Sequence, residues 1–253
     1  MGDKSSIEWT DATWNPSTGC SKVSPGCRNC YAERLSHRLY KMRNPKFTNG
    51  FNFTIHENAL MLPLKWKKPR KIFVNSMSDL FHEDMDDSFL IRCFEVMRSA
   101  DWHIFQVLTK RPERMLKFTE EFGTIPDNVW LGTSVELKSF TYRIDILRKI
   151  NAKVKFISFE PLLGPLGKLD LRDISWVIVG GESGPNARKV KIDWVRDVRD
   201  QANQQSVSFF FKQWGGKTPK SNGRLLDGRL WDEFPNSFNI KNDIRLDSSH
   251  KLV

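Results

Sequence analysis

The chain has 253 residues, of which 39% are hydrophobic and 28% are charged, a composition ordinary for a globular protein. No apolar stretch approaches the ~20 residues that cross a membrane, and the N-terminus lacks the layout of a signal peptide, so we expect no membrane partner. The formal net charge of +10 favours a polyanionic partner such as nucleic acid, although a merely solvated basic surface explains it equally well.

Short apolar runs that predict strands alternate with amphipathic stretches that predict helices. The strand segments are residues 12–16, 51–57, 71–76, 103–109, 129–134, 154–160, 176–182 and 207–214, and the helical patterns are 86–100, 111–122, 139–150 and 191–202. This alternation indicates right-handed βαβ units and a parallel sheet of up to eight strands. We therefore predict an α/β fold, a parallel (βα) barrel that is complete or partial. An open doubly wound sheet is the alternative.

Glycine and proline become frequent after residue 214, which predicts an irregular C-terminal segment. We expect one barrel over residues 1–214. A C-terminal extension over residues 215–253 is expected to pack on the barrel or trail from it. The last dozen residues have the composition of a frayed tail.

Three of the four cysteines form a C-x6-C-x2-C pattern, with Cys20, Cys27 and Cys30 in one loop that precedes a helical stretch. A closed zinc site or an ordinary iron–sulfur cluster has four protein ligands, so three thiolates leave one position of a metal centre open. The fourth cysteine, Cys93, lies in a predicted buried helix, where a thiol behaves as a small hydrophobe. This arrangement is not a disulfide framework, and it favours a reducing, cytoplasmic setting.

The densest basic run extends from Lys65 to Lys71 and contains Trp66. Cations interleaved with an aromatic ring suit a phosphate backbone and a stacked base. A plain loop that leads into the next strand is the alternative, and it explains the run somewhat better.

Polar residues follow the ends of the predicted strands, where the active sites of (βα) barrels lie. They are Ser76, Ser78, Asp79, Thr109, Lys110, Arg111, Thr133, Ser134, Glu136, Glu160, Gly180, Gly181, Glu182, Lys212, Gln213 and Trp214. Each alone predicts only a helix cap or a turn, but together they predict one polar rim. Glu160 and Glu182 each close an apolar strand, where an acid needs a partner or solvent.

The segments IEWTDATWNPSTGCSKVSPGCRNCYAE, FVNSMSDLFHED, WVIVGGESGPNAR and FFFKQWGGK, which fall between about residues 7 and 216, resemble the bacteriophage three-cysteine-motif proteins of the radical SAM superfamily. The resemblance implies a [4Fe–4S] cluster on Cys20, Cys27 and Cys30, whose open iron binds S-adenosylmethionine (SAM). It further implies an external reductant such as flavodoxin or ferredoxin. Reductive cleavage of SAM would give a 5′-deoxyadenosyl radical that abstracts hydrogen from a substrate.

The resemblance also implies roles for the residues of the polar rim. Cofactor-binding residues would be Ser76, Ser78, Asp79, Ser134, Glu136, Glu160, Gly180, Gly181 and Glu182, and substrate-binding residues would be Lys110, Arg111, Lys212 and Gln213. The implied substrate is a modified base in phage DNA or a nucleotide, remodelled by isomerisation or bond rearrangement in the host cytoplasm. The chain departs from the superfamily's usual C-x3-C-x2-C spacing. Asn29 also stands where an aromatic residue usually precedes the last cysteine, although Tyr31 follows it.

Two other functions fit parts of the sequence. In a zinc-stabilised nucleic-acid-binding protein without catalysis, His37, His56 or His82 would join the three cysteines in a Cys3His site. In a barrel hydrolase, Glu160 and Glu182 would serve as acid and base, which leaves the cysteines without a role.

Overall fold

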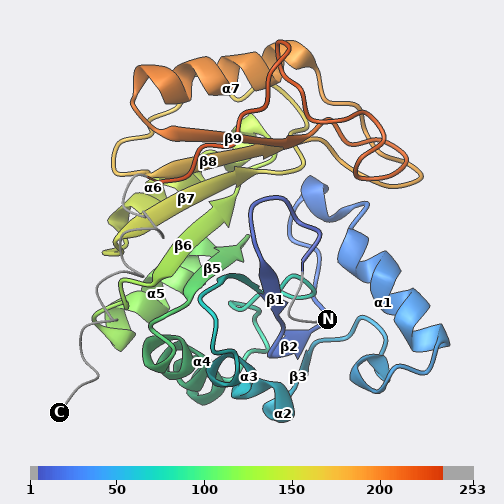
Figure 1. Ribbon diagram of the computed structural model, residues 1–253, viewed down its shortest axis with the longest axis vertical. Coiled ribbons are helices and arrows are strands. Elements are labelled where there is room, and N and C mark those ends of the chain that lie inside the picture. Colours follow the sequence, from blue (N-terminus) through green and yellow to red (C-terminus); the bar gives the residue numbers. More distant parts are fainter. Residues whose placement is uncertain (1–4, 236–253) are drawn as a thin grey trace.

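Seven parallel strands form one curled sheet in the computed structural model, which describes residues 5–235 (Figure 1). They are β1 (Ala12–Trp14), β4 (Lys71–Val74), β5 (Ile104–Thr109), β6 (Val129–Ser134), β7 (Val154–Phe159), β8 (Trp176–Gly180) and β9 (Ser208–Gln213), and they neighbour one another in chain order. Within the described residues, β1 and β9 are the two edges and do not pair with each other. The fold is therefore an α/β half-barrel, which confirms the partial form of the predicted barrel.

The prediction of an eighth barrel strand at residues 51–57 is wrong. Only β3 (Thr54–Ile55) is extended there, and it pairs antiparallel with β2 (Ser17–Thr18) in a separate two-stranded sheet. The residues just before β3 instead meet the chain after β2, since the Cys20 N–H donates to the Phe51 carbonyl at 3.2 Å. The segment thus supports the start of the cysteine-bearing loop and adds nothing to the barrel.

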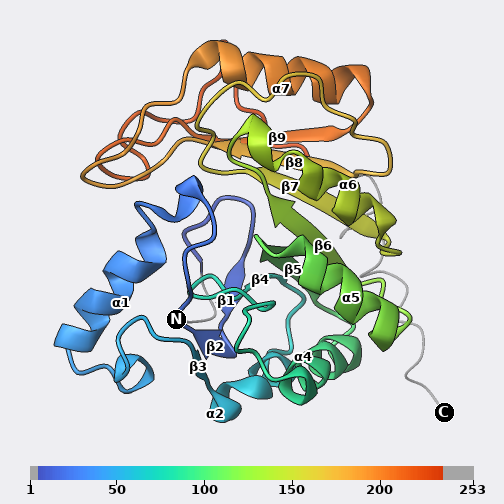
Figure 2. The ribbon, with the colours of Figure 1, turned by 180° about the vertical axis from the view of Figure 1, so that it is seen from behind.

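The helices that follow β4, β5, β6 and β8 cover the outer face of the sheet, whereas the first helix of the chain lies apart from that layer (Figure 2). The described residues form seven helices in all. They are α1 (Tyr31–Lys41), α2 (Glu57–Leu60), α3 (Leu62–Lys65), α4 (Asp87–Ser99), α5 (Pro112–Phe122), α6 (Tyr142–Lys149) and α7 (Ile192–Gln204), with 3-10 turns at Pro25–Cys27, Pro45–Phe47 and Lys138–Phe140. The Asp86 side chain caps α4 by accepting the Phe89 N–H at 2.9 Å. No helix within residues 5–235 combines the length and apolar character that a membrane crossing requires.

The inner face of the sheet changes character along the strands. Near the amino ends it carries a buried aromatic cluster that includes Trp130, Phe156, Trp176 and Phe210 and is joined by Trp9 from the N-terminal segment. Because side chains alternate along a strand, the same inner rows continue toward the carboxyl ends as Ser134, Ser158, Gly180 and Lys212. The half-barrel is therefore filled with apolar rings at one end and lined with polar groups at the other.

The described part of the C-terminal extension, residues 215–235, contains no helix and no strand longer than an isolated bridge, as predicted for an irregular segment. It packs along β9 through an isolated bridge between Phe210 and Asp232, and Leu226 and Trp231 are buried. The predicted frayed tail lies outside the described residues. The division of the chain at residue 214 stays a prediction.

The aromatic cluster generates a stability prediction. The Trp176 ring packs with Phe234 at 5.1 Å and with Phe156 at 5.7 Å between centroids, and its Nε1 donates to the Glu233 carbonyl at 2.8 Å. Replacing such a side chain with alanine leaves a cavity, so Trp176→Ala should lower the free energy of unfolding by about 3–5 kcal/mol in denaturant titrations. Trp102→Ala, at a partly exposed position, serves as the control and should cost less. Equal losses of unfolding free energy in the two variants would contradict a stabilising role of the aromatic cluster.

Candidate active site at the carboxyl ends of the strands

The loop that carries the three cysteines, residues 19–30, lies over the carboxyl ends of the strands (Figure 1). It begins where Gly19 forms an isolated parallel bridge with Ser78, whose hydroxyl donates to the Gly19 carbonyl at 2.6 Å. Gly19 has a φ of +82°, and a Cβ atom there would overlap the Asn52 carbonyl. Only glycine fits this close turn. We call residues 19–30 the cysteine loop.

All three loop cysteines are partly exposed, whereas Cys93 is fully buried in α4, as expected for a core residue. Burial, followed by the negative charge of Asp79, raises the pKa of Cys20 to about 11, and burial also raises that of Cys30. Within residues 5–235, no three His, Cys, Asp or Glu side chains converge closely enough to hold a metal ion. Among the described residues, the three thiols therefore share one loop without forming a ready-made site for a single metal ion.

Arg111 contacts the first cysteine of the loop, and Asp79 holds Arg111 in place. Arg111 Nη1 lies 3.7 Å from the Cys20 sulfur and 3.2 Å from Asp79 Oδ2, and its Nη2 donates to the Ser21 hydroxyl at 2.7 Å. Asp79 also accepts hydrogen bonds from the Thr109 hydroxyl at 2.7 Å and from the Lys110 N–H at 3.1 Å. The carboxylate is thus fully engaged, and it holds the guanidinium against the sulfur.

Glu136 is fully buried beneath the middle of the cysteine loop. Two cations neutralise it, Lys110 at 3.0 Å and Arg143 at 3.3 Å. The Ser24 hydroxyl of the loop donates to the same carboxylate at 2.6 Å. The loop approaches so closely that a Cβ atom on Gly26 would overlap the Glu136 side chain. A buried carboxylate at the end of β6 therefore fixes the loop next to Cys27.

Glu182 fixes the cysteine loop near its end, as Glu136 does near its middle. Its Oε2 accepts the Asn29 amide at 2.9 Å and the Arg188 Nε–H at 2.9 Å. Burial opposes ionisation, but the hydrogen bonds from Arg188 and Asn29 outweigh it and lower the pKa of Glu182. Arg188 also donates to the Pro25 carbonyl at 3.0 Å. Asn29 thus holds the loop to the rim.

The remaining rim residues form contacts of their own. Lys212 pairs with Glu160 at 3.1 Å, and the Ser158 hydroxyl donates to the same acid at 3.1 Å. Gly180 approaches the Glu160 side chain, and Gly181 approaches the Trp214 carbonyl, so protein atoms occupy the space that these glycines leave.

Three further rim residues contact neighbouring protein groups. Gln213 donates to the Ser183 hydroxyl at 2.6 Å. The Ser134 carbonyl accepts from Arg143 at 2.8 Å. The Ser76 carbonyl accepts the Tyr31 hydroxyl.

The candidate histidines have separate surroundings. His82 lies 3.1 Å from the Ser21 N–H through Nε2, and burial, with the positive charge of Arg111, lowers its pKa so that the neutral ring can accept this bond. His56 contacts the Thr18 hydroxyl at 2.8 Å. His37 shares a surface pocket with Cys20. Within residues 5–235 the structure assembles no Cys3His set.

The sequence did not lead us to predict several residues that hold the loop, among them Ser24, Asn29, Arg143 and Arg188. For Arg143, the sequence does contain a pattern that could have predicted its role. Arg143 continues the helical stripe of Leu147 and Ile150, and a cation on an otherwise apolar stripe indicates a buried acid partner. Ser24 and Asn29 show no such pattern, because small polar residues are ordinary in loops.

The buried ion pairs of Glu136 predict a measurable loss. Glu136→Gln keeps the shape but leaves Lys110 and Arg143 without a counter-charge, which should lower the free energy of unfolding by about 3 kcal/mol. Alkylation of Cys27 should also become faster as the loop loosens. Glu121→Gln is the control, because its pair with Lys117 spans 3.9 Å on the surface and should contribute less than about 1 kcal/mol. Similar losses in both variants would contradict the role of Glu136.

The chain matches a family model described as "Protein of unknown function (DUF5131)" over residues 4–235. No curated protein matches it. Two solved structures of spore photoproduct lyase resemble it, each with a TM-score of 0.44 and 12% sequence identity. One is complexed with dinucleoside spore photoproduct, and the match covers 74% of this chain and 59% of that one. The other is a mutant with bound AdoMet and the same dinucleoside, with coverages of 76% and 61%. This chain thus spans about three fifths of the length of those proteins.

Since the family model covers nearly the whole described chain, the protein belongs to the family described as protein of unknown function DUF5131.

Proposed function

We propose that the protein is a radical SAM enzyme that remodels a modified base in phage DNA or a nucleotide, working in the host cytoplasm with an external reductant. One observation carries the proposal. Three partly exposed thiols share one loop, and buried carboxylates hold that loop over the carboxyl ends of a parallel half-barrel. Enzymes built on such barrels place their chemistry at this end.

The donor set fits a [4Fe–4S] cluster with one open iron, because thiolates are the ligands that such clusters take from proteins. Cys20, Cys27 and Cys30 would hold the cluster, which when bound supplies the electron that cleaves SAM. Glu136 and Glu182 would orient the cysteine loop through Ser24 and Asn29. The aromatic cluster would close the opposite end of the half-barrel and exclude water from below.

Arg111 has a clearer role than the substrate binding expected from the sequence. Its Nη1 lies 3.7 Å from the Cys20 sulfur, and a hydrogen-bond donor next to a ligand sulfur raises the reduction potential of a cluster. Lys110 and Lys212 are each paired with an acid, Glu136 and Glu160. Each would bind a substrate phosphate or carboxylate through its remaining ammonium hydrogens while it stays beside its acid.

The cofactor prediction is tested by anaerobic purification and reconstitution with iron and sulfide. The full chain should be brown and hold about four irons. With dithionite and SAM it should release 5′-deoxyadenosine. Cys27→Ala should remove both properties, while Cys93→Ala, which changes only a buried core thiol, should retain them. A colourless protein that holds one zinc after reconstitution would overturn the proposal in favour of the zinc-stabilised nucleic-acid-binding protein.

The position of Arg111 generates a second prediction. Arg111→Gln removes the positive charge near the Cys20 sulfur, so the midpoint potential of the cluster should become more negative in a redox titration followed by electron paramagnetic resonance. Arg114→Gln, on the neighbouring helical turn and paired with Asp87 at 2.7 Å, is the matched control and should leave the potential unchanged. The same potential in all three proteins would contradict a role for Arg111 at the sulfur.

A further inference from the structure

Positive charge is concentrated around the cysteine loop and α1. Residues 20–56 contain seven cations, Lys22, Arg28, Arg34, Arg38, Lys41, Arg43 and Lys46, and a single acid, Glu33. Six of the seven cations are exposed, Lys46 being half-buried. Lys22 pairs with Glu33 at 2.9 Å, and Arg34 donates to the Ser183 carbonyl at 2.8 Å. We call residues 22–46 the basic segment.

Four cations of this segment remain available to a partner. Within residues 5–235, the side chains of Arg28, Arg38, Lys41 and Arg43 have neither an acidic partner nor a hydrogen-bond acceptor. A cluster of exposed cations without acids attracts a polyanion, and a phosphate backbone offers the matching charge.

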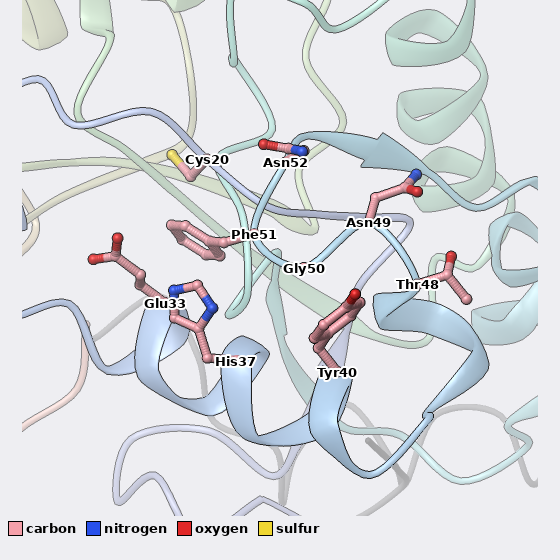
Figure 3. A pocket seen from close by; sticks show the side chains of 9 residues that line it. All are labelled: Cys20, Glu33, His37, Tyr40, Thr48, Asn49, Gly50, Phe51 and Asn52. Atoms are coloured by element: carbon pink, nitrogen blue, oxygen red, sulfur yellow. The ribbon is translucent and has the colours of Figure 1, made fainter.

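A polar pocket of about 610 Å³ lies against this segment (Figure 3). Glu33, His37 and Tyr40 reach into it from one face of α1, and Phe51 faces them from the opposite wall. Cys20 lies at its edge, so the pocket borders the proposed cluster. Its volume is within the range of small-molecule sites, about 300–1,000 Å³.

The lining of the pocket suits a flat polar ring. Within the described chain, the side chains of His37, Tyr40 and Asn52 have no hydrogen-bond partner. They offer donors and acceptors to the edge of a base. The Phe51 and Tyr40 rings offer faces on which a base can stack. The pocket and its surroundings therefore offer hydrogen-bonding groups for the edge of a base, aromatic rings for its face and cations for its phosphate.

We propose that the basic segment binds the phosphate backbone of single-stranded DNA and that the pocket beside Cys20 receives one unpaired base. The inference rests on the proposed function, and it names the strand that the enzyme would engage. An unpaired base is required because a base within a duplex is stacked and cannot enter such a pocket.

The basic run that stands out in the sequence, Lys65 to Lys71, lies elsewhere. It ends on the first residue of β4, and therefore at the amino end of the sheet, opposite the cysteine loop. Within it, Trp66 packs against the core and Arg70 lies over its ring at 5.3 Å. The run thus provides a control with similar charge and a different location.

The test measures binding of a fluorescent single-stranded oligonucleotide to the full chain by anisotropy, over a series of salt concentrations. Arg38→Gln/Lys41→Gln/Arg43→Gln should weaken binding at least tenfold at low salt and reduce the slope of log affinity against log salt by about two. Lys65→Gln/Lys67→Gln/Lys68→Gln removes the same charge at the other end and should change affinity less than about twofold. Tyr40→Ala should weaken binding about tenfold through lost stacking. A duplex of the same sequence should bind more weakly than the single strand.

Equal losses in the two triple variants would overturn the inference, as would the absence of binding at low salt or an unchanged affinity in Tyr40→Ala. These outcomes are separate from a failure of the proposed function. A protein that lacks the cluster but binds DNA through Arg38, Lys41 and Arg43 would support the surface and contradict the enzyme. A protein with an active cluster and no DNA affinity would support the enzyme and contradict the DNA-binding surface.

Discussion

The position of the cysteine loop depends on a buried negative charge, the Glu136 carboxylate at the end of β6. A carboxylate that is removed from water is stable only when cations and hydrogen-bond donors surround it. Lys110 comes from the neighbouring strand end and Arg143 from the following helix, and Ser24 brings the loop itself into the same contact. One acid thereby connects the sheet, a helix and the cysteine loop.

The two ends of the half-barrel have opposite characters because side chains alternate along each strand. Aromatic rings from Trp130, Phe156, Trp176 and Phe210 fill the inner face near the amino ends. Farther along the same rows the side chains are small or charged. Beyond the ends of β6 and β8, Glu136 and Glu182 hold the cysteine loop. The apolar end packs the sheet, and the polar end is where we propose that a cofactor and a substrate bind.

Much of this fold could be predicted, since seven of the eight expected strands lie in one parallel sheet. The segment at residues 51–57 was wrongly predicted to be a barrel strand, because its alternation of apolar and polar residues also suits a short strand outside the barrel. The polar rim was visible as residues at strand ends, but their partners were not. The bonds between Ser24 and Glu136 and between Asn29 and Glu182 join residues more than 100 positions apart, which periodicity cannot reveal. The net charge suggested a polyanion, but the sequence did not show which cations are exposed together. That grouping depends on how α1 packs.

We propose that three loop thiolates leave one coordination position of an iron–sulfur cluster open for SAM. This vacancy is tested by the electron paramagnetic resonance spectrum of the reduced, reconstituted protein, recorded before and after addition of SAM. Coordination at the open iron changes the electronic environment of the cluster, so the g-values should shift when SAM is added. A spectrum that stays the same at saturating SAM, or a protein without any reducible cluster, would contradict the account.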